Sequence, residues 1–342
     1  MKKLTIALLF GCLSLAITKP LLAQRPTTVK LATLVPDRSV WGQFLNKMRS
    51  DWGKVTDSRV KMTIFPNGTQ GDDPSVVRKM RIGQLGAATL TLTGLSEIDD
   101  YFSVFAIPLY FDSYEEYFYV LDQLQPVLEK RLRDKGFVFI HWGHGGWIHL
   151  FSTVPVKTID DLRKRKLFVW AGDDKLVSWY QRNGFKPVPL AITDVPMGLQ
   201  TGQIDAMPST PLAALALQWF RNTPYMLDMG FAPFLGATVV TERAWNKLSQ
   251  ADQEAILKVS RASAKFFSTE IPVEDAEAVT QMEKRGLTVV AVDDAATLAE
   301  WNAATEEFAT AMRQSIVPPE VFDLAQKARA DFRRRSQSPT SN

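Results

Sequence analysis

Three histidines lie close together in this chain, His141, His144 and His149, and imidazole can bind metals or transfer protons. Three glycines separate them, and no aspartate, glutamate or cysteine lies among them. His141 and His149 are expected on two different segments around a glycine turn rather than around one metal ion. We therefore expect histidines that line a cleft or a hinge, where glycine lets backbone approach a ligand, and we predict no metal site.

Other combinations of reactive residues are weak. The sequence contains no Gly-x-Ser-x-Gly elbow, no phosphate-binding glycine loop and no metalloprotease helix motif. The one nucleophilic set that can be assembled is Ser209 with His149 and Asp205, and nothing in the sequence brings these three within hydrogen-bond distance. We predict a protein that is not an enzyme and uses no cofactor. A hydrolase or lyase built on the same scaffold is the alternative from another class.

Aromatic residues suggest binding instead. The chain has nine tryptophans, and four of them fall between residues 142 and 179. Trp147 and Trp170 lie near the ends of expected strands, where the walls of ligand pockets are commonly aromatic, whereas Trp179 fits a packing role. Trp41, near the start of the first helix, is expected to cover the same cleft from the opposite side. Met207 and Phe234 are further candidates on the same argument.

The N-terminus indicates export. The chain begins with two lysines, Lys2 and Lys3, followed by an apolar run over 4–17 and by Leu21-Leu22-Ala23, which is typical of a secretory signal peptide cleaved after Ala23. The apolar run is too short for a spanning helix. We therefore predict a periplasmic protein. A retained signal anchor, or lipidation at Cys12, is the alternative.

The charge balance excludes some partners. The leader holds three lysines and no acid, so its removal lowers the basic residues from 40 to 37, equal to the 37 acidic ones. A neutral chain presents no broad basic face, and we predict no nucleic-acid partner. Cys12, the single cysteine, also leaves with the leader, so the exported chain needs no disulfide.

The elements that must position these residues alternate between strand and helix. Apolar patterns over 29–34, 40–55, 60–64, 72–82 and 87–92 predict a βαβαβ unit. A second unit follows with strands at 137–142, 166–170, 185–190 and 204–207, helices at 174–183 and 193–201, and a turn capped by Thr158. Later segments predict a helix at 211–220, a strand at 234–240 and one long helix from Ser249 to Lys284. Two such units predict facing lobes with a ligand cleft at the carboxyl ends of their strands, closed by a hinge.

Several segments resemble one family. The loop 68–73, the segment Ile107-Pro108-Leu109-Tyr110-Phe111 and the stretch 155–169 resemble, in order and spacing, substrate-binding proteins of TRAP transporters, the DctP family. The resemblance covers most of residues 27–310. It implies a receptor that captures a small organic acid and delivers it to a membrane permease. It also implies a long connecting helix and an order of lobes: 24–145 plus 234–273 in lobe I, 146–233 plus 274–325 in lobe II, with 326–342 as a disordered tail.

The chain departs from this family at three polar positions. The arginine that holds the ligand carboxylate in the family corresponds to Phe168, and a second arginine corresponds to Ile148. An asparagine of the family corresponds to Ser209. Bidentate Arg–carboxylate pairing offsets the lost hydration of a buried anion. Its loss predicts a hydrophobic or aromatic ligand.

One polar group of such a ligand would be oriented by Ser209, Thr93 or His149. Two alternatives concern the site: a carboxylate held by other cations, such as Arg38 or Arg182, or a degenerate cleft that binds nothing. A third concerns the system, because a carrier or sensor subunit without a TRAP permease would use the same cleft.

Overall fold

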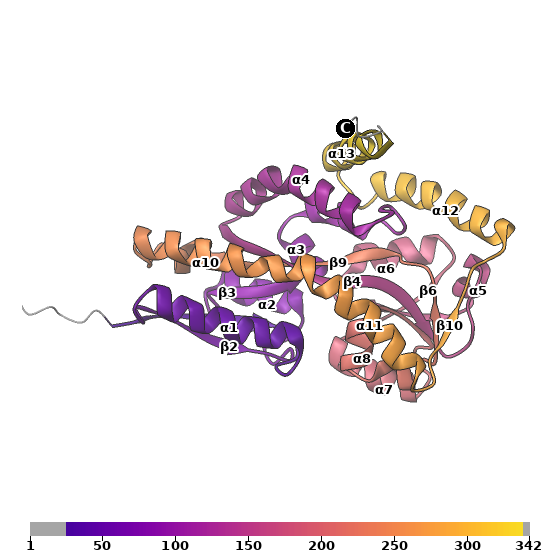
Figure 1. The fold of residues 1–342 in the computed structure, drawn as a ribbon, viewed down its shortest axis with the longest axis horizontal. Coiled ribbons are helices and arrows are strands. Elements are labelled where there is room, and N and C mark those ends of the chain that lie inside the picture. Colours follow the sequence, from indigo (N-terminus) through magenta and orange to yellow (C-terminus); the bar gives the residue numbers. More distant parts are fainter. Residues whose placement is uncertain (1–24, 338–342) are drawn as a thin grey trace, which may run out of the picture.

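The structure is a computed structural model that describes residues 25–337 (Figure 1). The predicted signal peptide, its cleavage site and Cys12 lie outside the described residues. Two groups of strands and helices lie on the left and right of Figure 1, and two strands, β4 and β9, run between them. No helix within residues 25–337 is long and apolar enough to cross a membrane.

The first group, lobe I, is a mixed sheet with strand order β2-β1-β3-β9-β4. Its strands are β1 (Thr27–Thr33), β2 (Val60–Phe65), β3 (Ala87–Thr91), β9 (Ala232–Thr241) and the first part of β4 (Phe137–Ser152). Strand β1 is parallel to β2 and β3, whereas β9 is antiparallel to both β3 and β4. The expected βαβαβ unit therefore forms, and its parallel strands end at one common edge.

The second group, lobe II, continues the sheet from the last part of β4. Its strands are β5 (Lys166–Trp170), β6 (Lys186–Leu190), β7 (Ala206–Ser209), β8 (Tyr225–Leu227) and β10 (Thr288–Val290). The strand order is β4-β7-β5-β6, and β5 is parallel to both of its neighbours, β6 and β7. Strand β4 is much longer than expected, and a bulge between His144 and Trp147 lies where it passes between the lobes. The predicted residue boundaries of the lobes stay a prediction.

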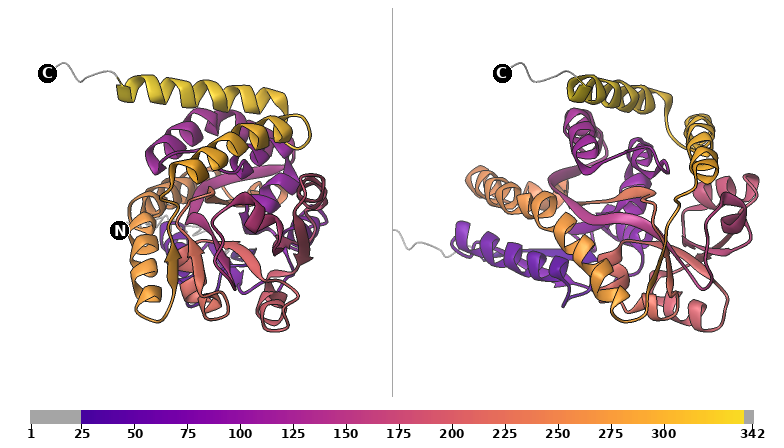
Figure 2. Two further views of the ribbon diagram at one scale, coloured as in Figure 1. Left: turned by 90° about the vertical axis from the view of Figure 1, so that its right-hand side faces the viewer. Right: turned by 45° about the vertical axis from the view of Figure 1, so that its right-hand side comes forward.

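Helices cover both faces of each sheet (Figures 1 and 2). In lobe I they are α1 (Val40–Val55), α2 (Asp73–Arg81), α3 (Leu92–Ile98), α4 (Tyr114–Asp134), α9 (Glu242–Trp245), α10 (Gln250–Thr269) and the short η1 (Asp100–Ala106). In lobe II they are α5 (Ile159–Arg163), α6 (Asp174–Arg182), α7 (Val195–Gln200) and α8 (Pro211–Ala216), with η2 (Ile192–Asp194) and η3 (Trp219–Arg221). Buried apolar side chains fill the space between these layers, so the cores lie where the sequence patterns require them.

The long connecting helix is bent. The prediction of a single helix from 249 to 284 is wrong, because α10 ends at Thr269 and α11 (Ile271–Glu283) starts two residues later. Pro272 lies in the first turn of α11 and has no N–H to donate, which ends the hydrogen-bond ladder of α10. Helix α10 lies against lobe I and α11 continues at an angle to α8 of lobe II, as Figure 2 shows.

The C-terminal segment is helical. Helices α12 (Ala295–Arg313) and α13 (Pro319–Gln337) follow β10, and α13 packs on α4. The prediction of a disordered tail over 326–342 is therefore wrong for 326–337. The reason is electrostatic: Glu116 is 1% exposed, and Arg333 donates to its Oε2 at 3.2 Å while also pairing with Asp112 at 2.7 Å. Arg333 thus neutralises a buried carboxylate and holds the helix against α4.

Candidate ligand-binding site

A cavity of about 180 Å³ lies between the two lobes. Four strands end at its wall, with Thr33 closing β1, Thr91 closing β3, Trp170 closing β5 and Ser209 closing β7. Ligands of open α/β sheets bind outside the carboxyl ends of the strands, because side chains and loops converge there. We call this space the inner cavity.

The inner cavity carries no charged side chain among the described residues. Its apolar wall comes from both lobes: Leu34, Val35, Pro36, Trp41, Leu45, Leu90, Ile148, Phe168, Trp170, Ile192, Pro208, Ala213, Leu217, Trp219, Phe234 and Phe267. The rest of the wall is made of threonine, serine, glycine and His144. Burying apolar ligand surface against such a wall stabilises a complex by about 25 cal/mol per Å².

Phe168 lies at the centre of the lobe II wall. Its side chain is 1% exposed and packs within the core of lobe II while it also faces the cavity. The ring of Trp170 lies 5.7 Å away in a tilted arrangement. The position that the family resemblance assigns to an arginine is therefore held by a well-packed aromatic ring.

The polar side chains of the wall are mostly occupied by other protein groups. Thr89 pairs with Thr238 at 2.8 Å, and the Ser209 hydroxyl donates to the Thr210 carbonyl at 3.1 Å. The indole N–H of Trp41 donates to the His144 carbonyl at 3.2 Å. Among the described side chains, none accepts a hydrogen bond from the Trp170 indole. A ligand in this cavity meets few free polar groups, and Trp170 can supply one donor.

A buried carboxylate lies directly behind the wall. Asp73 is 2% exposed and accepts hydrogen bonds from Thr91 N at 2.9 Å and from Thr91 Oγ1 at 2.6 Å. Burial raises the pKa of Asp73 to about 6, and no cation contributes to its environment. At neutral pH this carboxylate is largely ionised, so it disfavours a second anion in the adjoining cavity.

The lobes touch around the rim of the cleft. Lys175 on α6 pairs with Asp100 at the start of η1, with Nζ–O distances of 2.9 and 2.8 Å. Gly172 lies so close to Pro74 of the other lobe that a Cβ there would come within 2.9 Å of the proline ring. The two lobes are therefore in contact at this rim.

Most of the ten predicted site residues meet at this cavity. Six line the inner cavity: Trp41, Ile148, Phe168, Trp170, Ser209 and Phe234. Thr93 lines an adjoining cavity that shares part of the same wall. Met207 does not reach the cavity, because its side chain is fully buried in the lobe II core with Phe151 and Phe220.

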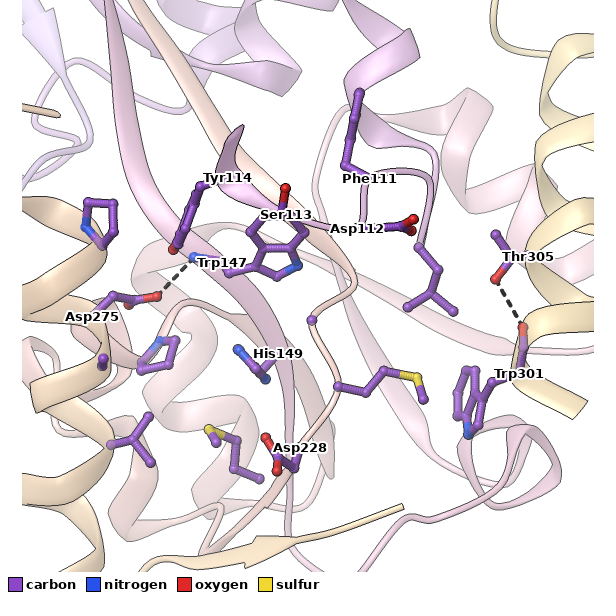
Figure 3. A pocket seen from close by; sticks show the side chains of 18 of the residues that line it. Phe111, Asp112, Ser113, Tyr114, Trp147, His149, Asp228, Asp275, Trp301 and Thr305 are labelled. Atoms are coloured by element: carbon purple, nitrogen blue, oxygen red, sulfur yellow. Dashed lines mark hydrogen bonds between the residues drawn. The ribbon is translucent and has the colours of Figure 1, made fainter. Parts of the chain in front are cut away.

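Trp147 and His149 lie on the other side of β4. They line a groove of about 1130 Å³ between α11 and α12, shown in Figure 3, which we call the back groove. Trp147 N donates to Asp275 Oδ2 at 2.9 Å, and His149 Nδ1 lies 3.1 Å from the Leu227 carbonyl. The structure therefore places these two residues at the back groove and not at the inner cavity, and their role in ligand binding stays a prediction. The pleat of β4 sends Ile148 to the cavity and its two neighbours to the groove.

The reactive residues do not assemble into a catalytic or metal site. His141 stacks on Phe267, His144 packs against Tyr114, and burial lowers the pKa of both imidazoles. No group of three or more metal-binding side chains occurs among the described residues. Asp205 accepts from Lys166 N at 2.6 Å, whereas Ser209 and His149 bond to separate carbonyls, so the nucleophilic set does not form.

Sequence reasoning missed several wall residues. Trp219 in η3 and Ala213 in α8 line the cavity from beyond β7, and Leu34 and Val35 line it from beyond β1. The signal that could have found Leu34 and Val35 is positional, because they follow directly after β1, whose carboxyl end faces the cleft. Trp219 was hidden in a segment that reads as an ordinary amphipathic helix.

The fold and the cleft define a two-lobed α/β binding protein. Residues 31–315 match the family model described as bacterial extracellular solute-binding protein, family 7 (DctP), and the chain belongs to this family. It is a TRAP-type solute receptor and not an enzyme.

Relatives agree with this assignment. The chain is 26% identical to a solute-binding protein of Roseobacter denitrificans over 278 residues, covering 79% of this chain and 83% of the relative. It is 21% identical to the sialic acid-binding periplasmic protein of Vibrio cholerae over 270 residues, covering 78% and 84%. A Bordetella pertussis extracytoplasmic solute receptor that binds pyroglutamic acid superposes with a TM-score of 0.81 at 17% identity, covering 89% of this chain and 99% of that chain. This solved structure shows the fold that the two chains share.

Proposed function

We propose that this receptor captures a neutral, mainly apolar or aromatic small molecule in the inner cavity and delivers it to a TRAP permease. The observation that carries the proposal is the absence of any charged side chain among the described residues of the cavity wall, with Phe168 at its centre. Periplasmic location, through removal of the predicted leader, is part of the same proposal.

Electrostatics distinguishes a site for neutral ligands from a site for carboxylic acids. An unpaired carboxylate buried in a dry site costs several kcal/mol, on the order of what a small ligand gains from apolar contact. Arg38 and Arg182, the cations considered from the sequence, do not line the cavity, and the buried Asp73 carboxylate is hydrogen-bonded to Thr91 of its wall. Relatives differ here, since the Roseobacter denitrificans protein was solved with bound L-galactonate, which carries a carboxylate.

The test is the identity and chemistry of the bound ligand. The mature protein is purified from cells without refolding, denatured, and its released small molecules are identified by mass spectrometry. Isothermal titration of the ligand-free protein with benzyl alcohol and with galactonate gives the same comparison in vitro. We expect a neutral aromatic or aliphatic compound and measurable binding of benzyl alcohol alone. Binding of galactonate in preference to benzyl alcohol would overturn the proposal.

A further inference from the structure

A second cavity adjoins the inner cavity. It has a volume of about 200 Å³, and we call it the outer compartment. Five residues line both spaces: Thr91, Ile148, Trp170, Pro208 and Phe234. The two spaces are therefore separated by the thickness of a few side chains, chiefly the Trp170 and Phe234 rings.

The outer compartment is apolar along most of its length and polar at one end. Its wall includes Leu176 and Tyr180 of α6, Phe105 and Ala106 of η1, and Phe308 of α12. Asp100 and Lys175 line the end that reaches the surface, where their side chains are 48% and 60% exposed. A molecule that lies in this compartment can keep a polar end in water while its body is covered.

Size favours a ligand that occupies both spaces. An apolar cavity of about 150 Å³ in another protein holds a single benzene molecule, so the inner cavity fits one ring with a small substituent. Sites for small organic ligands usually span roughly 300–1,000 Å³. Each space alone falls below that range, at about 180 and 200 Å³, and the two together fall within it.

We propose that the cargo is an elongated amphiphilic molecule, with a ring in the inner cavity and a second apolar segment in the outer compartment that ends in a polar group near Asp100. This inference rests on the proposed function and adds the length and the two-part shape of the cargo. Trp170 and Phe234 then determine specificity, because their side chains lie between the two parts of the cargo.

A series of ligands of growing length tests the proposal. Benzyl alcohol, phenylbutanol and phenylhexanol share the ring and the hydroxyl and differ in the number of methylenes. Each buried methylene adds about 0.8 kcal/mol, or about threefold in affinity after losses of chain freedom. We expect affinity by isothermal titration to rise on the order of 100-fold from benzyl alcohol to phenylhexanol.

Two variants assign the effect to the two spaces. Thr93 lines only the outer compartment and Ala213 only the inner cavity. Thr93→Phe should abolish the gain in affinity from longer chains, so that phenylhexanol binds this variant no more tightly than benzyl alcohol does. Ala213→Phe should weaken every member of the series.

The outcomes separate this proposal from the function on which it rests. If benzyl alcohol binds the wild-type protein and longer chains bind no more tightly, the two-part cargo is wrong and the apolar receptor stands. If no member binds while galactonate does, the proposed function itself fails. The wild-type series decides between these outcomes even if a variant does not fold. A gain with chain length that persists in Thr93→Phe would place the chain elsewhere and overturn the assignment of the outer compartment.

Discussion

The inner cavity and the back groove lie on opposite sides of the same strand, and they differ in charge. Ile148 of β4 faces the cavity, whereas its neighbours Trp147 and His149 face the groove. The cavity wall has no charged side chain among the described residues, but the groove holds acids and arginines, among which Arg333 pairs with Asp112 and Asp275 binds a backbone N–H. The larger hollow is thus polar and crossed by hydrogen bonds, whereas the smaller one has a mainly apolar wall.

The groove is braced chiefly by Asp275 of α11. Its carboxylate accepts hydrogen bonds from Trp147 N and from Leu212 N, each at 2.9 Å, and the Tyr114 hydroxyl also faces it. One side chain therefore joins α11, the crossing of β4 and the start of α8. Gly146 lies against it with φ of 106°, where a Cβ would come within 2.5 Å of the carboxylate. The carboxylate defines the geometry of the crossing, and the cavity depends on that geometry.

The largest expected effect comes from placing a charge in the cavity wall. Phe168→Arg buries a guanidinium with no anionic partner in the wall, and we expect the free energy of unfolding to fall by about 3–5 kcal/mol. Binding of benzyl alcohol should also be lost. Urea unfolding and isothermal titration measure the two effects.

Phe168→Leu is the control substitution that changes the side chain without adding a charge. It conserves the apolar character and should cost at most about 1.5 kcal/mol in stability. If Phe168→Arg is as stable as Phe168→Leu and binds galactonate more tightly, the cleft tolerates a carboxylate-binding arginine, and Phe168 alone separates this protein from receptors for acids. If both variants keep wild-type binding of benzyl alcohol, the ligand lies elsewhere.

The next effect tests the groove. Asp275→Ala leaves two buried N–H groups without an acceptor, each worth about 1–3 kcal/mol, so we expect a loss of about 2–4 kcal/mol in the free energy of unfolding. Glu277→Ala, an exposed position on the same helix, is the control and should change stability by less than about 0.5 kcal/mol. Urea unfolding curves of the two variants measure the difference. Equal midpoints would show that Asp275 does not hold the crossing.

The two regions should also respond to pH in opposite directions. Burial raises the pKa of Asp275 to about 6, so the folded state takes up this proton first as pH falls, and the contribution of Asp275 to stability rises between pH 6 and the unfolded value near 4. Burial lowers the pKa of His144 to about 3, so the unfolded state takes up that proton first, and stability falls below about pH 6.5.

Difference profiles isolate each group. The stability of wild-type protein minus that of Asp275→Asn should increase on acidification from pH 6 to 4, and the same difference for His144→Gln should decrease. Each slope approaches about 1.4 kcal/mol per pH unit. Urea unfolding at several pH values measures both profiles. Asp73 and His141 titrate in the wild-type protein and in each variant, so their contributions cancel in the differences. Slopes of the same sign would contradict the assignment of these two burial effects.

The sequence predicts the order of strands and helices along the chain and six residues of the cavity wall. Periodicity found the strands whose ends form the cleft, and the resemblance to the family located Phe168 and Ile148. Trp147 and His149 flank Ile148 on one strand, so strand alternation places them on the opposite face, and the prediction of all three in one cleft overlooked that alternation. Which of the two faces meets the cavity depends on the bulge at residues 144–147, which no local pattern reports. The helix at 326–337 was missed because its partner, Glu116, is distant in the sequence. Local patterns predict elements, whereas facing and long-range ion pairs depend on tertiary contacts.

The smallest expected effect concerns the rim, where the Lys175–Asp100 pair crosses between the lobes. Both side chains are about half exposed, at 60% and 48%, so the pair should contribute less than about 1 kcal/mol to stability. Its effect should appear in the rate of ligand release, because only the closed arrangement forms it. We expect Lys175→Ala to release phenylhexanol about two- to fivefold faster in stopped-flow experiments at low salt. At 1 M salt, where screening acts over about 3 Å, the difference should vanish.

Lys130→Ala removes a comparable exposed pair with Asp134 on α4, with a 2.6 Å separation, and should leave release unchanged. A faster release in both variants would show a general charge effect, and the rim pair would then have no part in holding the lobes together.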